Sequence, residues 1–224
     1  MDRVEIRYDK RSAAGAALLG LTLLGAVLVA IHPGPFQVDS AVLHGLIGTR
    51  SPALTGIVDD VSRLLSPVAM AGWTALIVVA LIVRDRSVRR ALPVAGAVAI
   101  AAGLDTMIKL AVTRPRPPAV LQVGSPESTY SYPSGHVCGT TVLVMTLLAV
   151  TVAGLPRARA LAATVLAVAV IVLCAWTRLY LGAHWLSDVT GGALLGLSAA
   201  LAVPPLLDVV LRRVGERIDV KGLL

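Results

Sequence analysis

Hydrophobic runs dominate the pattern of this chain, and short polar segments rich in Arg separate them. Each run of Leu, Val and Ala is about twenty residues long, which in a helix is enough to cross the ~30 Å hydrocarbon core of a bilayer. The runs predict six membrane-spanning helices, at residues 12–31, 67–83, 91–112, 137–155, 158–176 and 184–203. We therefore expect an all-α fold, a bundle of six transmembrane helices that forms one domain over residues 1–224.

Features beside the long runs refine this prediction. Residues 51–65 repeat apolar positions at helical spacing, which indicates an amphipathic helix that packs on the outer membrane surface. Ser66 and Pro67 suit the start of the second span, as a cap and a first-turn residue. The pair Pro204-Pro205 is expected to end or kink the sixth span. The first span is long for the apolar core of a signal peptide and no small-residue cleavage site follows it, so we expect it to be retained.

The distribution of Lys and Arg predicts the orientation of the spans. Fourteen of the twenty basic residues fall in the N-terminal segment, the second–third loop, the fourth–fifth loop and the C-terminal segment. Cytoplasmic loops carry an excess of Lys and Arg, so both termini are expected in the cytoplasm. The other six basic residues belong to the outer side or near it: Arg50, Arg63, Lys109, Arg114, Arg116 and Arg178.

The composition supports a membrane protein and argues against a nucleic-acid-binding one. Hydrophobic residues make up 56% of the chain and charged residues 15%, whereas soluble domains carry roughly 25% charged residues. The net charge of +7 is divided among short clusters between apolar runs, so it forms no continuous basic face. The abundance of Ala, Gly, Val and Arg is typical of bacteria, and we expect the bacterial cytoplasmic membrane as the location.

Four of the outer cations converge near one membrane face: Lys109, Arg114, Arg116 and Arg178. Charges near hydrocarbon are costly and are usually functional. Arg binds phosphate through its bidentate fork, and Lys binds it as a point charge. A single such residue is explained by a side chain that extends to the interface. Lys109, Arg116 and Arg178 together predict a phosphate-binding site.

A second candidate motif, Pro133-Ser134-Gly135-His136, stands immediately before the fourth span. Ser134 is placed to cap that helix, so the backbone N–H groups of Ser134, Gly135 and His136 would point outward and could bind an anion. Glycine lets the backbone approach a phosphate closely. His136 adds a titratable group beside the predicted anion site.

A third motif contains His184 and Asp188, four residues apart. If the sixth helix begins near His184, the two side chains share one face of it. A carboxylate bonded to one ring nitrogen fixes the tautomer and leaves the other nitrogen free to act as a nucleophile. The spacing also fits a His–Asp pair that only satisfies itself at the membrane surface.

The remaining His, Cys and acidic residues suggest no metal centre. No spacing among them resembles a zinc or two-metal site. Cys138 and Cys174 lie inside apolar runs and lack the paired spacing of a disulfide or a metal site. We expect no role for the other outer residues of these types: His32, His44, Asp39 and Glu127.

The three motifs, in this order, resemble the type 2 phosphatidic acid phosphatase family, whose active site is related to that of vanadium haloperoxidases. The family pattern is Lys-x6-Arg-Pro, then Pro-Ser-Gly-His, then Ser-Arg-x5-His-x3-Asp. This chain matches it from Lys109 to Asp188, with Thr177 in place of the Ser. Threonine keeps the hydroxyl, so the departure is small.

The resemblance implies a role for each matched residue. The phosphoryl oxygens would be held by Lys109, Arg116, Ser134, Gly135 and Arg178, which would also stabilise charge in the transition state. His184, oriented by Asp188, would attack phosphorus and form a phosphohistidine. His136 would protonate the leaving oxygen and then activate water. The family implies no metal and no cofactor. Its substrates would be lipid phosphates or diphosphates in the bilayer, among them undecaprenyl diphosphate, phosphatidylglycerol phosphate, phosphatidic acid and diacylglycerol diphosphate.

One hypothesis goes beyond the family pattern. Asp105 lies four residues before Lys109, so both occupy one face of the third span. A lone acid at that depth would be costly. We therefore expect Asp105 to pair with Lys109 and to direct its ammonium group toward the phosphate.

Other functions remain open from the sequence. Phosphotransfer from a lipid diphosphate to another acceptor would use the same motifs. Halide oxidation with vanadate uses a similar site, but in soluble proteins. An anion transporter would need polar residues along the inner halves of the spans, and these are almost wholly Ala, Val, Leu, Gly and Ile.

Overall fold

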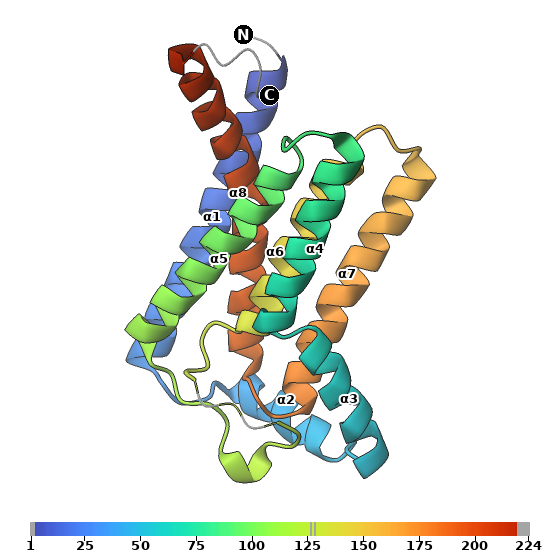
Figure 1. Ribbon diagram of the computed structural model, residues 1–224. Coiled ribbons are helices and arrows are strands. Elements are labelled where there is room, and N and C mark those ends of the chain that lie inside the picture. Colours follow the sequence, from blue (N-terminus) through green and yellow to red (C-terminus); the bar gives the residue numbers. More distant parts are fainter. Residues whose placement is uncertain (1–2, 126, 128, 219–224) are drawn as a thin grey trace.

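The computed structural model describes residues 3–125, 127 and 129–218, and every regular element within these ranges is helical (Figure 1). The prediction of an all-α fold is confirmed. The helices in chain order are α1 (Arg3–Ile31), α2 (Gln37–Ile47), α3 (Pro52–Leu64), α4 (Pro67–Asp85), α5 (Ala91–Val112), a short 3-10 helix (Ala119–Leu121), α6 (Gly135–Thr151), α7 (Arg157–Tyr180) and α8 (Leu186–Ile218).

In the described part of the chain, five helices are long and apolar enough to cross a membrane: Lys10–Ile31 of α1, α4, α5, α7 and Leu186–Leu211 of α8. The sixth predicted span corresponds to α6, which is apolar but has only 17 residues. A helix of this length extends about 26 Å, at the short limit for a transmembrane helix. The number of six spans therefore stays a prediction.

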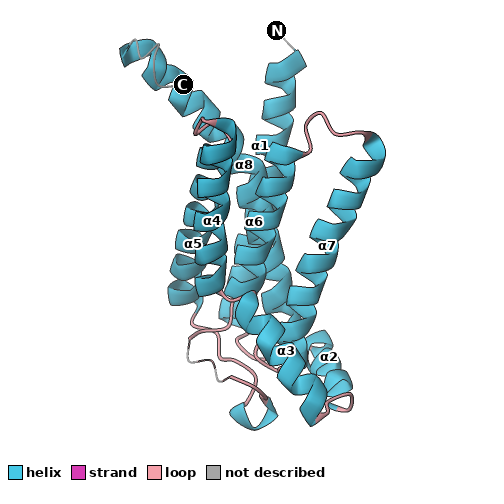
Figure 2. Ribbon diagram, turned by 45° about the vertical axis from the view of Figure 1, so that its right-hand side comes forward, coloured by secondary structure: helices cyan, strands magenta, loops and turns pink. Residues whose placement is uncertain are grey.

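The structure corrects the ends of the last predicted span. α8 begins at Leu186 rather than at residue 184, and it continues through Pro204 and Pro205 to Ile218. These prolines were expected to end or kink the helix. The helix does not end there, and its last turns lean away from the bundle (Figure 2). Proline removes backbone hydrogen bonds, but membrane helices tolerate this where neighbouring helices and local adjustments satisfy the freed carbonyls.

Two shorter helices, α2 and α3, lie at one end of the bundle. α3 confirms the helix expected at residues 51–65, and it starts with Pro52 in its first turn and the Ser51 hydroxyl accepting from the Leu54 N–H at 3.3 Å. α2 was not expected. Its start is stabilised by Asp39, whose Oδ2 accepts from the Phe36 N–H at 3.1 Å. An acidic residue at this position of the first turn is the local signal that the sequence carries for α2.

α8 forms the centre of the bundle and packs on α1, α5 and α6. Small residues make these contacts close. The Ser198 hydroxyl on α8 donates to the Gly15 carbonyl on α1 at 2.8 Å, and Gly196 lies directly against the backbone of α6 at Cys138. Membrane helices associate through such small-residue contacts because lipid tails already solvate the larger apolar side chains. In contrast, the outer faces of α1, α4 and α7 expose many large apolar side chains.

The connections group at the two ends of the bundle as the spans predict. The start of α1, the end of α8 and the α4–α5 and α6–α7 connections lie at one end (Figure 1). α2, α3, the α5–α6 segment and the α7–α8 turn lie at the other end. The basic segments assigned to the cytoplasm therefore share an end, although residues 219–224 of the C-terminal segment lie outside the described part. The orientation across a membrane stays a prediction.

Candidate active site

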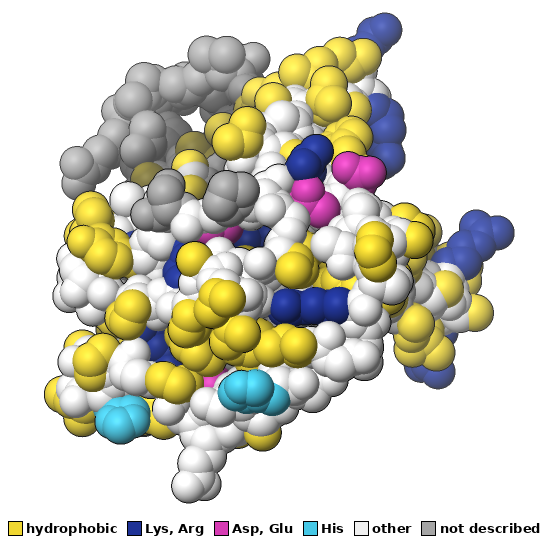
Figure 3. Space-filling view, turned by 90° about the horizontal axis from the view of Figure 1, so that it is seen from below, with side chains coloured by type: hydrophobic (Ala, Val, Ile, Leu, Met, Phe, Trp, Pro, Cys, Tyr) yellow, Lys and Arg dark blue, Asp and Glu magenta, His cyan; other side chains and the backbone are white. Residues whose placement is uncertain are grey.

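The predicted site residues gather at the end of the bundle that holds α2 and α3. The end of α5, the α5–α6 segment, the start of α6, the end of α7 and the α7–α8 turn all contribute side chains. All of these except the end of α7 line a cavity of about 640 Å³, whose lining includes Lys109, Arg116, His136 and His184. Three elements that are far apart in the sequence are thus brought together around one space. In the view from this end, some Lys and Arg side chains lie recessed between the loops, and others project at the rim of the molecule (Figure 3).

Lys109 projects from the last turn of α5 into the cavity and is held by an acid and a carbonyl. Its Nζ donates to both oxygens of Asp105, at 2.9 and 2.8 Å, and to the Pro133 carbonyl. Both side chains are mostly buried, at 14% and 12% exposure. The pair expected from the spacing is present, and Gly135 lies next to it, since a Cβ there would be 3.2 Å from Asp105 and 3.6 Å from Lys109 Nζ.

Arg116 belongs to the α5–α6 segment and contacts the α7–α8 turn. Its Nη1 donates to the Ala183 carbonyl at 2.6 Å and to His184 Nε2 at 3.0 Å. Its Nε donates to the Thr129 carbonyl at 2.6 Å. The guanidinium group can only donate, so Nε2 of His184 must be the acceptor, which places the proton of the neutral ring on Nδ1.

Arg178 enters the site from the last turn of α7. Its Nη1 donates to the Ser62 hydroxyl of α3, and its Nη2 donates to Glu127 Oε1 at 2.6 Å. Arg178 is only 3% exposed, and its Nε has no hydrogen-bond partner among the described residues. α3 therefore contributes Ser62 to the site. Ser62 holds Nη1 of Arg178, while Nη2 is directed at an anion.

Glu127 is the site residue that the sequence interpretation missed. Its carboxylate lies 2.6 Å from Arg178, 3.4 Å from Arg116 and 4.0 Å from His136 Nε2. The expectation that nothing ties Glu127 to the site is wrong. It stands alone in a polar segment, and only the folded chain brings it to cations that are 11 and 51 residues away. Two guanidinium groups can hold an anion between them, and in this structure that anion is the Glu127 carboxylate.

The Pro-Ser-Gly-His motif starts α6, with Ser134 as its N-cap residue. Two expectations need correction. The Ser134 hydroxyl makes no cap bond and has no hydrogen-bond partner in the described part of the chain. The Ser134 N–H donates to the Asp188 carbonyl at 3.0 Å, so it is not free for an anion. The N–H groups of Gly135 and His136 are in the first turn, where a helix provides no acceptor, and they remain suited to an anion.

His184 and Asp188 do not share a helix face, because α8 begins only at Leu186. His184 lies in the turn before it, and its Nδ1 is 3.5 Å from Asp188 Oδ2. The same oxygen accepts from the Trp185 N–H at 2.9 Å, so Asp188 also fixes the start of α8. This turn brings His184 close to Asp188, which helical spacing was expected to do. His184 Nδ1 has no hydrogen-bond partner among the described residues, and a small shift of the ring would give it one in Asp188.

The environment of His184 keeps its ring neutral. Burial lowers the pKa of His184 well below its ordinary value of 6.5, and the charges of Arg116, Arg178 and Lys109 lower it further. A neutral ring with an accepting Nε2 is the form that can attack phosphorus.

This environment predicts a pH-dependent stability. Below about pH 6.5 the unfolded chain binds a proton at His184 that the folded chain does not bind. The free energy of unfolding should therefore fall as the pH decreases from 6.5, by up to about 1.4 kcal/mol per pH unit. Melting temperatures of the detergent-solubilised protein between pH 7.5 and 5.5 test this, with His184→Gln as the comparison. The wild-type protein should lose more stability than the variant; parallel curves would contradict the prediction.

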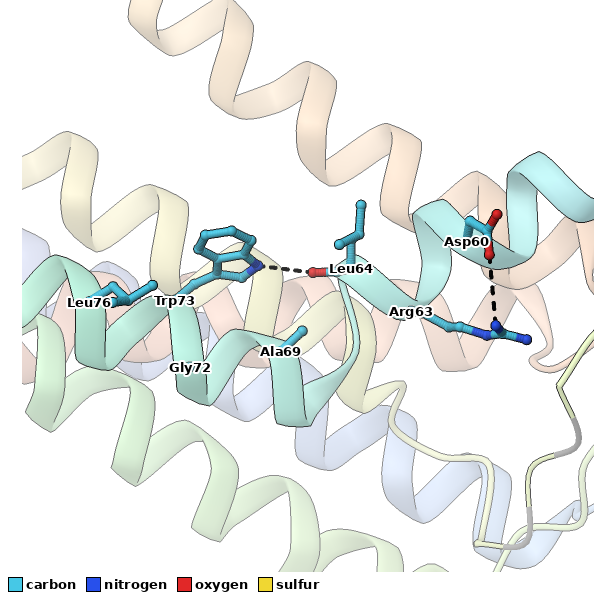
Figure 4. Close-up of a pocket in the computed structure, with 7 residues that line it drawn as sticks. All are labelled: Asp60, Arg63, Leu64, Ala69, Gly72, Trp73 and Leu76. Carbon is cyan, nitrogen blue, oxygen red and sulfur yellow. Dashed lines mark hydrogen bonds and ion pairs between the residues drawn. The ribbon is translucent and has the colours of Figure 1, made fainter.

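Other concave or polar features lie outside this cluster. A hollow of about 590 Å³ runs along α3 and α4, where Trp73 Nε1 donates to the Leu64 carbonyl at 3.1 Å and Arg63 pairs with Asp60 at 3.7 Å (Figure 4). It contains none of the site residues and is largely apolar. His32 and His44 are exposed. Among the described residues, no three His, Cys, Asp or Glu side chains gather closely enough to hold a metal ion.

Comparisons with known proteins agree with the fold and the motifs. The family model of the PAP2 superfamily matches residues 90–210, more than half of the 224-residue chain. A crystal structure of a transmembrane PAP2-type phosphatidylglycerolphosphate phosphatase from Bacillus subtilis is similar, with a TM-score of 0.73, 21% identity and coverage of 91% of this chain and 96% of that one. LpxE of Aquifex aeolicus is similar with a TM-score of 0.57, 21% identity and coverage of 78% and 96%. No curated protein sequence matches significantly.

Proposed function

The chain belongs to the PAP2 superfamily, and we propose that it is a membrane phosphatase that hydrolyses a lipid phosphate or diphosphate at the outer face of the bacterial cytoplasmic membrane. The observation that carries this proposal is the cavity in which Lys109, Arg116, His136 and His184 meet. Cations of this kind bind a phosphoryl group, and two histidines provide a nucleophile and an acid.

In the proposed complex the phosphoryl group replaces the Glu127 carboxylate between Arg116 and Arg178. Lys109 and the Gly135 N–H would contact its remaining oxygens, and the unpartnered Ser134 hydroxyl would donate to one of them. The three cations then neutralise the equatorial oxygens as charge develops on them in the transition state. This donor set would bind the phosphoryl group without a metal.

The proposed chemistry has two displacements at phosphorus. Nε2 of His184 attacks, the N–P bond forms, and the bond from phosphorus to the leaving oxygen breaks. His136 gives its proton to that oxygen; the bound phosphate dianion favours the protonated form of His136 beforehand. In the second step neutral His136 takes a proton from water, the water oxygen bonds to phosphorus, and the N–P bond breaks. Asp188 stabilises the positive charge that develops on the His184 ring while the N–P bond exists.

Asp105 is proposed as a positioning residue for Lys109. Two bonds to its carboxylate and one to the Pro133 carbonyl fix the ammonium group at the edge of the cavity. Without Asp105, the ammonium would be free to turn away from the phosphate. The residue therefore acts through Lys109 rather than on the substrate.

The lining of the cavity favours a lipid substrate. Besides the site residues it includes Pro67 at the start of α4 and Thr106 and Leu110 on the exposed side of α5. A headgroup bound at the cations would therefore leave its apolar tail beside these helices, in the bilayer. Undecaprenyl diphosphate, phosphatidylglycerol phosphate, phosphatidic acid and diacylglycerol diphosphate all have this form. Phosphotransfer to a second acceptor is the alternative reaction, because water and an alcohol would attack the same phosphohistidine.

The test is phosphate release by the purified protein in detergent with EDTA present. Undecaprenyl diphosphate, phosphatidylglycerol phosphate and phosphatidic acid are compared in parallel. Release that continues in EDTA would support the proposed metal-independent chemistry, and the preferred lipid would identify the substrate. Absence of release from every lipid by folded protein would refute the phosphatase. Product formation only when an acceptor alcohol is added would favour phosphotransfer.

Replacement of Glu127 by Gln should improve phosphate binding. The carboxylate competes with the substrate for Arg116 and Arg178, and a neutral amide of the same shape competes less. We expect the inhibition constant of inorganic phosphate to fall about tenfold, which corresponds to ~1.4 kcal/mol. Glu127→Asp, which keeps the charge, is the matched control and should change it less. An unchanged or higher inhibition constant in Glu127→Gln would show that Glu127 does not compete with phosphate.

A further inference from the structure

A second buried ion network lies behind the catalytic cluster, and Arg114 is its centre. The Arg114 side chain is 0% exposed and does not line the cavity. Its guanidinium group lies 5.7 Å from the Phe36 ring and 5.9 Å from the Trp185 ring. A charge buried to this extent is costly unless it is fully paired. The partners of Arg114 therefore indicate its role.

Arg114 pairs with two buried carboxylates that come from opposite parts of the chain. Its Nη1 lies 2.5 Å from Asp188 Oδ1, and its Nη2 lies 3.0 Å from Asp39 Oδ2. Both carboxylate side chains are 0% exposed. The expectation that Asp39 has no tie to the site is therefore wrong. One cation bridges two buried acids, so loss of Arg114 would remove a charge partner from both.

Asp39 also connects this network to the start of α8. Its Oδ1 accepts from the Ser187 N–H at 2.8 Å and from the Ser187 hydroxyl at 2.9 Å. The Ser187 hydroxyl in turn accepts from Arg114 Nη1 at 2.7 Å. α2, which carries Asp39, is thereby fixed to the first turn of α8, directly after the turn that holds His184.

The bonds to Asp188 define how its carboxylate faces His184. Arg114 occupies Oδ1, whereas Oδ2 accepts from the Trp185 N–H and is the oxygen 3.5 Å from His184 Nδ1. With Oδ1 held, the carboxylate cannot rotate, and Oδ2 stays directed at the ring. Both hydrogen-bond partners of Asp188 contribute to this orientation. A carboxylate held by the Trp185 N–H alone could still rotate about that one hydrogen bond.

We infer that Arg114 and Asp39 are positioning residues for the nucleophile: Arg114 orients and charge-stabilises Asp188, and Asp39 holds Arg114. The inference rests on the proposed role of His184. Neither residue touches the phosphoryl group. Loss of either should therefore slow the attack on phosphorus without weakening substrate binding, in contrast to loss of a phosphate-binding cation.

The experiment measures kcat and KM for phosphate release by Arg114→Gln, Arg114→Lys, Asp39→Asn and the double variant Asp39→Asn/Arg114→Gln. Arg114→Gln should lower kcat by about 10- to 100-fold at a nearly unchanged KM. Arg114→Lys keeps the charge but cannot bridge both acids, so its kcat should be intermediate. Asp39→Asn should also lower kcat, and the double variant should lose less than the product of the two single effects, because the residues act as a unit.

Two controls separate positioning from mere stability. Ser198→Ala removes a buried bond between α1 and α8 far from the site, and it should lower the melting temperature but not kcat. Added guanidinium ion should restore part of the kcat of Arg114→Ala, an effect that a purely structural role would not produce.

The inference is overturned if folded Arg114→Gln keeps the wild-type kcat or if its loss lies only in KM. If Arg114→Gln does not fold, Asp39→Asn serves as the test instead. It removes the contact by which Asp39 holds Arg114, but Arg114 remains paired with Asp188. Failure of the proposed function would look different, since the wild-type protein itself would then release no phosphate from any lipid.

Discussion

Replacement of His184 by Gln is expected to lower kcat for lipid phosphate release by roughly 10⁴-fold or more. Gln fills a similar space and can still bond to Asp188, but it has no nucleophilic ring nitrogen. Without the N–P bond, water would have to attack the lipid phosphate directly. Removal of the attacking group in a unit of this kind costs nearly the whole chemical advantage.

Rapid acid or base quench of a reaction with labelled substrate provides the direct measurement. The wild-type protein should retain label in a base-stable, acid-labile form, as expected of a phosphohistidine, and His184→Gln should retain none. His44→Gln is the matched control, because His44 is exposed on α2 and bonds only to the Ser40 carbonyl. If His184→Gln kept a tenth of the wild-type rate, another nucleophile would have to be sought.

The second large effect is expected for Arg178→Gln, which should lower kcat/KM by about 10³-fold or more. Arg178 is nearly buried, and its fork joins Ser62 to the position of the phosphate. The variant also leaves Glu127 without its closest cation, at a site where the substrate must bring further negative charge. Both effects raise the free energy of the bound substrate and of the transition state.

A second substitution separates these two effects. In Arg178→Gln/Glu127→Gln no unpaired carboxylate remains, so the double variant should recover part of the loss in KM while kcat stays low. Arg178→Lys restores a charge but not the bidentate fork, and it should be intermediate in kcat. Steady-state kinetics on the preferred lipid measure all three variants. Equal kinetics for Arg178→Gln and the double variant would show that Glu127 has no influence on substrate binding.

Local sequence patterns predicted most of the helices but few of the ion pairs. The spans follow from runs of apolar residues, and α3 follows from helical spacing, because both signals are contained in consecutive residues. α2 was missed although Asp39 in its first turn is a local signal, because a single acidic residue indicates a helix start more weakly than a long apolar run indicates a span. α8 runs through Pro204 and Pro205, because packing and lipid override a local preference.

For the site, the motif spacing identified the cations and histidines that line the cavity, and it identified Lys109 with Asp105 because that pair is one helical turn apart. It could not assign Arg114 or Asp39. Their contact joins positions 75 residues apart, and neither position carries a local mark of its partner. Glu127 was missed for the same reason. Charge alone cannot distinguish a solvated acid from one that folding places between two guanidinium groups.

The contact of α1 with α8 has a consequence for how the protein forms. Gly15 and Ser198, which join these helices, are 183 residues apart. During synthesis α1 enters the membrane long before α8 is made. Until α8 arrives, the face of α1 that will pack on it contacts lipid or other proteins. His184 and Asp188 belong to the same late segment. Closure of the bundle and completion of the candidate site therefore coincide, because α8 and the turn before it supply both.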